Sequence, residues 1–359
     1  MKTIMILASG TGGHVYPAYT ISLEYLARGY KIVWVGTLKG LENNVINDER
    51  IHIEHIDSIG MRGMSKLRKI LAGLILLKSI FQSYLLMKKY KPSLVLGFGG
   101  YVSVGPSLVS FVLSIPLLVH EQNSIAGTAN KINYYVATKV YETFPSSFNK
   151  HDAKIIHTGN PIRKDFNSLV KPEEKYNSNI SHLNILVMGG SLGALFLNKN
   201  MPFALSHFHR NSLTVKHISG KGNMDFVEKK YNSYDINSNI IEYADKISSL
   251  YDWADLIVCR AGSTSISEIS KTGRAVVLIP FPHATDNHQL YNAKYLANNS
   301  AAIILEQTDD FIENFITIVN ILLNDQKRIY TLSKNIQNIF PDDPVKLIVD
   351  DSLRHVKNQ

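Results

Sequence analysis

The sequence predicts an α/β protein made of two Rossmann-like domains with a cleft between them. Its 359 residues suit two domains of ordinary size, roughly 100–200 residues each. Both halves open in the same way, with a short apolar strand, a glycine-rich loop and a helix. Short apolar runs separated by helical stretches are typical of a parallel sheet that helices cover on both faces.

The expected strands are short, apolar and bounded by turn residues. They are Thr3–Ala8, Lys31–Val35, Ser93–Leu96 and Pro116–His120 in the first half, and Leu183–Met188, Asp255–Cys259 and Ala275–Ile279 in the second. The helices after the two glycine loops are expected over Val15–Arg28, which ends at Gly29, and over Ala194–His207.

A change in composition marks the boundary between the domains. Residues 164–181 are polar and rich in turn formers, so we expect them to be an inter-domain linker. The domains are then 1–163 and 182–340. The remaining segment, 341–359, contains a predicted helix over Pro344–His355, which we expect to pack back on the first domain.

The overall composition is that of a folded protein from a reducing compartment. Apolar residues make up 45% of the chain and charged residues 19%, which argues against disorder. Cys259 is the one cysteine in the sequence, so no disulfide forms within the chain. These features favour a cytosolic α/β enzyme.

Positive charge is concentrated in the first half. Residues 1–164 hold 19 Lys and Arg against 9 Asp and Glu, within a net charge of +8 for the whole chain. The segment Arg62–Lys91 has eight Lys or Arg and no acidic residue. It is either a core helix with a solvated basic side or a segment that meets an anionic membrane surface. No apolar run reaches the roughly 18–20 residues of a membrane span, and we expect no nucleic acid partner because no recognition motif is present.

The glycine loops do not match the dinucleotide or Walker fingerprints. The first loop has Val15 where a third glycine belongs, and the next strand ends at Gly36-Thr37 without the acidic residue that binds a ribose. Glycines at a helix start still let a backbone approach a phosphate closely. A nicotinamide dehydrogenase is therefore disfavoured. The first loop favours a phosphate or another electron-rich ligand, with a tight turn between strand and helix as the alternative.

Several polar clusters follow the predicted strands. His14 follows the first loop and is either a general base near neutral pH or a capping or packing histidine. Glu268 lies one turn into a helix that starts at Ser263, where a carboxylate can bind both hydroxyls of a ribose. The other clusters are 120–123, 160–163, Ser191, 260–265 and 286–289. Each has a loop or capping interpretation when taken singly.

A metal centre is not expected. His52 and His55 lie in an alternating strand-like run, and His207 and His209 lie near a helix end, so we interpret all four as surface histidines. The sequence also contains no Asp-x-Asp, which metal-dependent sugar transferases use to hold a pyrophosphate. Helix N-termini and arginine would have to bind that group here.

Seven motifs occur in a characteristic order over nearly the whole chain. They are Gly10-Thr11-Gly12-Gly13-His14, Gly99-Gly100-Tyr101-Val102-Ser103, His120-Glu121-Gln122-Asn123, Gly159-Asn160-Pro161-Ile162-Arg163, Gly189-Gly190-Ser191, Arg260-Ala261-Gly262-Ser263 and Asp286-Asn287-His288-Gln289. Together they resemble the bacterial peptidoglycan N-acetylglucosaminyltransferases of glycosyltransferase family 28.

The resemblance implies the glycosyltransferase type B fold and a reaction without a cofactor. The donor would be UDP-N-acetylglucosamine, bound mostly by the second half. The acceptor would be lipid I, undecaprenyl-pyrophosphoryl-N-acetylmuramoyl-pentapeptide. Its muramoyl 4-hydroxyl would displace UDP with inversion and give lipid II. The family also implies a peripheral place on the cytoplasmic face of the inner membrane, a part in cell shape and division, and contacts with other wall-synthesis proteins.

The resemblance also assigns roles by matching positions. His14 matches the base or a close acceptor-side contact. The positions that match donor contacts are Thr11, Gly12, Gly13, Asn123, Arg163, Ser191, Ala244, Ser263, Thr264, Ser265, Ile266, Ser267, Glu268 and Gln289. Glu268 would hold the ribose, and Ala244 would contact uracil through its backbone. Ser191 and the helix start at Ser263 would stabilise the departing UDP.

Three departures from the family pattern avoid these positions. Ser9 stands where glycine is usual, Leu192 replaces a common glutamine, and Thr272–Ala275 lacks a usual proline. Another UDP-sugar-dependent transferase of this fold, or an epimerase, stays an alternative because fold alone does not separate them. A non-catalytic nucleotide-sugar-binding scaffold would be expected to have lost His14, Arg163 or Glu268.

Overall fold

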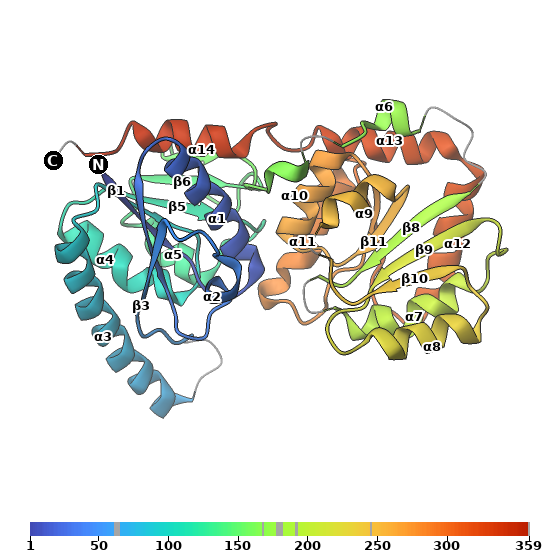
Figure 1. Ribbon diagram of the computed structural model, residues 1–359, viewed down its shortest axis with the longest axis horizontal. Helices are drawn as coiled ribbons and strands as arrows, with labels where there is room; N and C mark the ends of the chain where they lie inside the picture. Colours follow the sequence, from blue (N-terminus) through green and yellow to red (C-terminus); the bar gives the residue numbers. More distant parts are fainter. Residues whose placement is uncertain (61–64, 167–168, 177–181, 191–192, 245, 358–359) are drawn as a thin grey trace. The chain divides into compact units, whose positions relative to one another are not determined.

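The structure is a computed structural model that describes residues 1–357 apart from 61–64, 167–168, 177–181, 191–192 and 245. It divides the chain into two compact units. Unit 1 contains Met1–Arg163 and Asp343–Gln359, and unit 2 contains Lys164–Asp342. Figure 1 labels the helices and strands of both units.

Unit 1 is built on a parallel sheet. Among the described residues it has seven strands in the order β3-β2-β1-β4-β5-β6-β7. Their bounds are β1 Thr3–Leu7, β2 Lys31–Gly36, β3 Ile51–His55, β4 Leu94–Gly97, β5 Leu117–Glu121, β6 Lys139–Glu142 and β7 Ile155–His157. Its helices are α1 Gly12–Ala27, α2 Glu42–Val45, α3 Lys66–Tyr90, α4 Val104–Val112, α5 Thr128–Tyr134 and α14 Pro344–Leu353, with a 3-10 turn η1 at Tyr101–Ser103.

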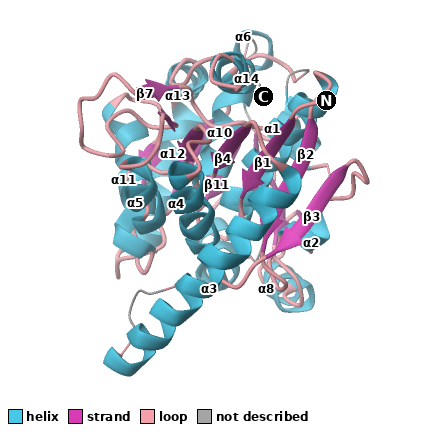
Figure 2. Ribbon diagram, turned by 90° about the vertical axis from the view of Figure 1, so that its left-hand side faces the viewer, coloured by secondary structure: helices cyan, strands magenta, loops and turns pink. Residues whose placement is uncertain are grey.

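Alternate side chains of each central strand enter different cores, one on each face of the sheet. Ile4 and Ile6 of β1 pack with α1 and α14 on one face. Met5 and Leu7 pack with residues of α3, α4 and α5 on the other. Figure 2 shows the sheet with its helices from the side of unit 1. Both faces are therefore covered, as an all-parallel sheet requires.

Helix α14 completes unit 1, although it comes from the far end of the sequence. It lies beside α1, and its Ile348 and Val349 are fully buried in the core that they share. The hydroxyl groups of Tyr25 and Ser352 are 2.5 Å apart, and Tyr141 donates a hydrogen bond to Asp351 at 2.9 Å.

Unit 2 has its own parallel sheet, with six strands among the described residues in the order β10-β9-β8-β11-β12-β13. The bounds are β8 Leu183–Met188, β9 Leu213–Ile218, β10 Ser238–Ile241, β11 Leu256–Cys259, β12 Ala275–Leu278 and β13 Ile303–Ile304. Its helices are α6 Pro172–Lys175, α7 Leu195–Leu205, α8 Met224–Ser233, α9 Ile247–Trp253, α10 Ser263–Thr272, α11 His288–Asn298, α12 Phe311–Asn324 and α13 Gln326–Gln337, with 3-10 turns η2 at Lys164–Phe166 and η3 at Thr285–Asn287.

The two sheets have the same strand order through their first six strands. In each sheet the first strand lies between the second and the fourth, so the direction of winding reverses there. Ligands of open α/β sheets bind beyond the carboxyl ends of the strands at this switch point. The α/β class and the two Rossmann-like parallel sheets predicted from the sequence are confirmed.

Some details differ from the sequence-based expectations. Helix α1 begins at Gly12 rather than Val15, because Thr11 with its extended backbone already serves as the N-cap. Strand β5 continues through Glu121, one residue beyond the expected end. Part of α3, Leu71–Tyr90, is long and apolar enough to cross a membrane by length and composition alone, and 22% of an 18-residue stretch within it is buried.

Candidate functional site

The switch point of unit 1 is flanked by two glycine turns. Gly10 follows β1 with φ +99°, and Gly99 and Gly100 follow β4 with φ +99° and +75°. These backbone conformations are ones that glycine adopts readily and other residues rarely. Gly12 and Gly13 begin α1, where the first N–H groups of a helix are directed toward a ligand rather than into the helix.

His14 lies between the two turns. Its Nδ1 is 3.3 Å from the carbonyl oxygen of Ser9, and a Cβ added to Gly99 would lie 3.2 Å from its Nε2. A side chain at position 99 would therefore displace the imidazole. When Nδ1–H donates to Ser9, the basic lone pair is on Nε2, which is the tautomer that a general base needs.

Glu121 organises the loop after β5. Its carboxylate is buried and accepts hydrogen bonds from the N–H groups of Asn123 at 2.9 Å and Gly127 at 3.0 Å. It also accepts one from Nδ2 of Asn130 at 2.8 Å. The position of Asn123 is thus set by a carboxylate whose role the sequence did not reveal.

His120 is a buried structural histidine. Its Nε2 is 3.1 Å from the carbonyl oxygen of Gly159, and its Nδ1 is 3.1 Å from Nε2 of Gln122. Burial lowers the pKa of His120 to about 4, so the ring is neutral near pH 7. A neutral ring that donates from Nε2 and accepts at Nδ1 satisfies both contacts, and it ties β5 to the segment after β7.

That segment ends in Asn160 and Arg163. Both amide atoms of Asn160 are buried, and they have no hydrogen-bond partner among the described residues. The guanidinium of Arg163 lies 5.7 Å from the ring centroid of Tyr16 on α1. The structure therefore brings Arg163 to the same helix that carries Gly12, Gly13 and His14.

In unit 2, the helix start predicted to bind the ligand is that of α10, which follows β11. Gly262 is its N-cap, and Ser263 begins it. The hydroxyl of Thr264 is buried, and it has no hydrogen-bond partner in the described part of the chain. Ile266 is fully buried, and Ser267 donates to the carbonyl of Ser263 at 2.9 Å. Those two side chains serve the fold, and the N–H of Ile266 donates to the carbonyl of Gly262 at 2.9 Å, so the free N–H groups of the helix start precede Ile266.

Glu268 is a buried carboxylate on the second turn of α10. It is 7% exposed, and its Oε2 accepts a hydrogen bond from the hydroxyl of Tyr251 at 3.3 Å. The sequence singled out Glu268 but not Tyr251, because the two are 17 residues apart on different helices.

Arg260 adds a cation at the end of β11. It is buried, and its Nη1 donates to the carbonyls of Ile279 at 3.1 Å and Pro280 at 3.3 Å. Burial lowers its pKa to about 10, so it keeps its charge at neutral pH. In the sequence it precedes the first residue of α10, Ser263, by three residues.

The remaining predicted residues of unit 2 lie on three further segments. Oε1 of Gln289 accepts a hydrogen bond from the N–H of Phe281 at 2.9 Å, which fixes the loop before η3. Ala244 is half-buried in the segment after β10. Ser191 lies outside the described residues, between Gly190 and Gly193, whose φ values are +90° and +74°.

No group of three or more His, Cys, Asp or Glu that could hold a metal ion occurs in the described part of the chain. His52 contacts Glu54, and His55 contacts Asn43, both on the surface of unit 1.

The sequence matches two family descriptions. Residues 4–142 match "Glycosyltransferase family 28 N-terminal domain", and residues 184–345 match "Glycosyltransferase family 28 C-terminal domain". A UDP-N-acetylglucosamine--N-acetylmuramyl-(pentapeptide) pyrophosphoryl-undecaprenol N-acetylglucosamine transferase from Haemophilus ducreyi is 37% identical over 332 residues, which are 91% of this chain and 92% of that protein.

Solved structures agree with this similarity. MurG from Acinetobacter baumannii has a TM-score of 0.85 and 31% identity, with 99% of this chain and 100% of that chain covered. A UDP-GlcNAc 2-epimerase from Neisseria meningitidis has a TM-score of 0.66 at 15% identity, over 99% of this chain and 100% of that chain. At that identity the second similarity shows the fold alone.

Proposed function

The chain belongs to glycosyltransferase family 28, and we propose that it transfers N-acetylglucosamine from UDP-N-acetylglucosamine to lipid I, giving lipid II for peptidoglycan synthesis. The observation that carries this proposal is the similarity, over nine-tenths of both chains, to a transferase whose name states that donor and acceptor. An epimerase lacks comparable support, because its similarity is confined to the fold.

The reaction is a single displacement at the anomeric carbon of the donor. The muramoyl 4-hydroxyl forms a bond to C1 of N-acetylglucosamine while the bond from C1 to the β-phosphate oxygen breaks, so the configuration inverts. His14 accepts the hydroxyl proton on Nε2, the nitrogen left basic when Nδ1–H is bonded to Ser9. The electron pair of the broken bond leaves with UDP.

The departing UDP is stabilised by fixed dipoles and charge in unit 2. The start of α10 offers backbone N–H groups and the hydroxyls of Ser263, Thr264 and Ser265, and Arg260 supplies a buried cation nearby in sequence. Such preorganised groups act most strongly on the charge that grows in the transition state. Glu268 accepts hydrogen bonds from the ribose hydroxyls, and the backbone of Ala244 contacts uracil.

The remaining site residues complete the proposed donor and acceptor contacts. On the unit 1 side these are Thr11, Gly12, Gly13, Asn123 and Arg163. In unit 2, the further proposed donor contacts are Ser191, which would stabilise the departing UDP, and Gln289.

We further propose that unit 1 binds the anionic inner membrane through α3. The side chains of Leu71, Leu74, Leu77, Phe81 and Leu85 are 50–64% exposed. Phe111 and Val112 at the end of the adjacent α4 are 61% and 77% exposed. Lys88 lies on the same helix, and each cation near an anionic surface contributes about 1 kcal/mol. Lys78 and Lys89 are paired with Asp57 at 2.8 Å and with Glu54 at 2.9 Å, so they add less net charge there. Arg62 lies outside the described residues.

This membrane position fits a lipid-linked acceptor, which reaches the enzyme only at the bilayer. The enzyme is then peripheral on the cytoplasmic face of the inner membrane. Because lipid II is the building block of the wall, the activity of the enzyme supports cell shape and division. Other wall-synthesis proteins are the proposed partners of the enzyme.

The proposal is tested by UDP release from UDP-N-acetylglucosamine, with and without a lipid I analogue. We expect release to depend on the acceptor. His14→Ala should lower acceptor-dependent release by about 100-fold or more and leave UDP binding, measured by calorimetry, within about twofold. His55→Ala, a change of an exposed histidine, is the matched control and should keep full activity.

Two results would contradict this proposal. Release that is independent of the acceptor would remove the transferase assignment. Equal losses of activity and UDP affinity in His14→Ala would make His14 a donor-binding or structural residue instead of the base.

A further inference from the structure

Tyr251 is a buried residue that the reaction scheme does not use. It lies on α9, is fully buried, and directs its hydroxyl at Oε2 of Glu268, 3.3 Å away. A buried tyrosine hydroxyl usually has a hydrogen-bond partner, and here that partner is the carboxylate proposed to bind the ribose.

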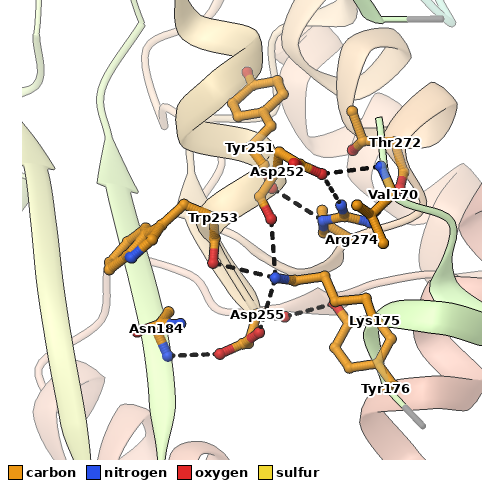
Figure 3. A network of polar contacts seen from close by, with 10 residues as sticks. All are labelled: Val170, Lys175, Tyr176, Asn184, Tyr251, Asp252, Trp253, Asp255, Thr272 and Arg274. Atoms are coloured by element: carbon orange, nitrogen blue, oxygen red, sulfur yellow. Dashed lines mark hydrogen bonds and ion pairs between the residues drawn. The ribbon is translucent and has the colours of Figure 1, made fainter. Parts of the chain in front are cut away.

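The backbone of Tyr251 is held by a buried arginine. Nε of Arg274 donates to the carbonyl of Tyr251 at 3.0 Å, and Nη1 donates to the carbonyl of Thr272 at 2.6 Å. Arg274 is fully buried and also pairs with Asp252 at 2.8 Å. Thr272 is the last residue of α10, so Arg274 links the helix of Tyr251 to the helix of Glu268 (Figure 3).

The segment that follows Arg163 packs on the same cluster. The ring of Phe166, which is 1% exposed, has its centroid 5.5 Å from that of Tyr251. The N–H of Val170 donates to Oδ1 of Asp252 at 3.0 Å. Lys175 donates to the carbonyl of Asp252 at 2.9 Å and pairs with Asp255 at 3.2 Å (Figure 3).

We propose that Tyr251 is a positioning residue for the donor nucleotide, acting through Glu268. Its hydroxyl occupies one acceptor site on Oε2 and fixes the carboxylate, so that the remaining sites face both ribose hydroxyls. A carboxylate has about four such acceptor sites, and orienting it in advance removes an ordering cost from binding. The residues Phe166 and Val170 support this arrangement by holding α9. The inference rests on the proposed role of Glu268 in binding the ribose.

The geometry predicts that Tyr251 controls recognition of the ribose rather than the chemical step. Tyr251→Phe keeps the ring that packs on Phe166 and removes only the hydroxyl. A matched control is Tyr176→Phe, since the Tyr176 hydroxyl lies in the same cluster but donates to the carbonyl of Asp255 at 2.9 Å rather than to Glu268.

The test compares the affinities of the full-length protein for UDP and for 2′-deoxy-UDP by calorimetry. We expect the wild type to bind UDP at least tenfold more tightly. Tyr251→Phe should weaken UDP binding about five- to tenfold, as expected for a lost hydrogen bond to a charged group. It should weaken 2′-deoxy-UDP binding less, because that ligand keeps only the 3′-hydroxyl for Glu268 to bind. KM for UDP-N-acetylglucosamine should rise by the same factor while kcat stays within about twofold. Tyr176→Phe should keep the wild-type ratio of affinities.

The outcomes separate this inference from its premise. If Glu268→Gln keeps the wild-type ratio of the affinities for UDP and 2′-deoxy-UDP, Glu268 does not bind the ribose hydroxyls, and the inference fails with that premise. If Glu268→Gln abolishes the ratio but Tyr251→Phe preserves it, the inference alone is overturned. Equal weakening of both ligands in Tyr251→Phe would show a merely structural role and would also overturn it.

Discussion

At the scale of single residues, Gly193 in unit 2 lies where its backbone packs closely against the backbone of Ser219. Gly193 has φ +74°, and a Cβ added there would lie 2.2 Å from the carbonyl oxygen of Ser219. Gly222 also has a positive φ of +76°, but nothing lies within 4 Å of its added Cβ. The two positions share the backbone requirement and differ in the space around them.

This difference predicts that the same substitution lowers the free energy of unfolding by different amounts at the two positions. Gly222→Ala should lower the free energy of unfolding by about 1–2 kcal/mol, from the left-handed backbone alone. Gly193→Ala should cost about 2 kcal/mol more, because the methyl group also collides with rigid backbone. Urea unfolding of both variants checks this. Equal costs would mean that the loop moves away from Ser219 without penalty.

The sequence predicted those candidate residues that follow an apolar run directly. Gly10–Gly13, His14, Asn123 and Ser263 each come just after a strand, so their place at the carboxyl edge of a sheet could be inferred. Tyr251 and Arg274 were not found because their partners come from other elements. Arg274, for example, pairs with Asp252, 22 residues earlier. No local pattern marks such a contact.

At the scale of elements, α3 has two different faces. Ile80, Leu86 and Met87 belong to the core under the sheet of unit 1, whereas Leu77 and Phe81 are 64% and 62% exposed. The buried face agrees with the core interpretation of this segment, and the interfacial interpretation stays a proposal for the exposed apolar face.

The exposed face of α3 should govern membrane binding. Leu77→Gln combined with Phe81→Gln should weaken binding to vesicles of anionic phospholipid at least tenfold, because two large apolar groups no longer enter the bilayer. Ile321→Gln on α12, where the side chain is 39% exposed, is the matched control. Vesicle sedimentation measures the effect, and unchanged binding by the double variant would exclude this surface.

Elements were predictable from sequence where they are long or fully buried. β1 and β8 are apolar apart from Thr3 and Asn184, and their other side chains are buried, which is a strong signal. β7 and β13 have three and two residues, all only half-buried. Their strand conformation comes from pairing with β6 and β12. A run of two or three residues is too short to show the alternation or apolar pattern that predicts a strand.

At the scale of the whole molecule, the last helix stabilises a unit made mostly of the first 163 residues. Ile348 is fully buried in the core of unit 1, while its neighbour Leu347 is 45% exposed. The pair offers a direct comparison between a core position and a surface position on one helix.

Ile348→Ala should lower the stability of unit 1 by about 2–5 kcal/mol, because it leaves a cavity between α1 and α14. Hydrogen exchange followed by mass spectrometry should show faster exchange in peptides from β1, β2 and α1. Peptides from residues 184–340 should be unchanged. Leu347→Ala should alter neither set, and protection lost equally in both units would contradict independent cores.

The division of the chain has a consequence for synthesis on the ribosome. Unit 2 is one uninterrupted stretch, Lys164–Asp342, whereas unit 1 is completed only by residues after Asp342. Translation therefore delivers every residue of unit 2 before the helix that closes the first core. Until then, the hydrophobic surface of α1 that α14 covers is open to water and to chaperones, so the half that begins first is the half that finishes folding last.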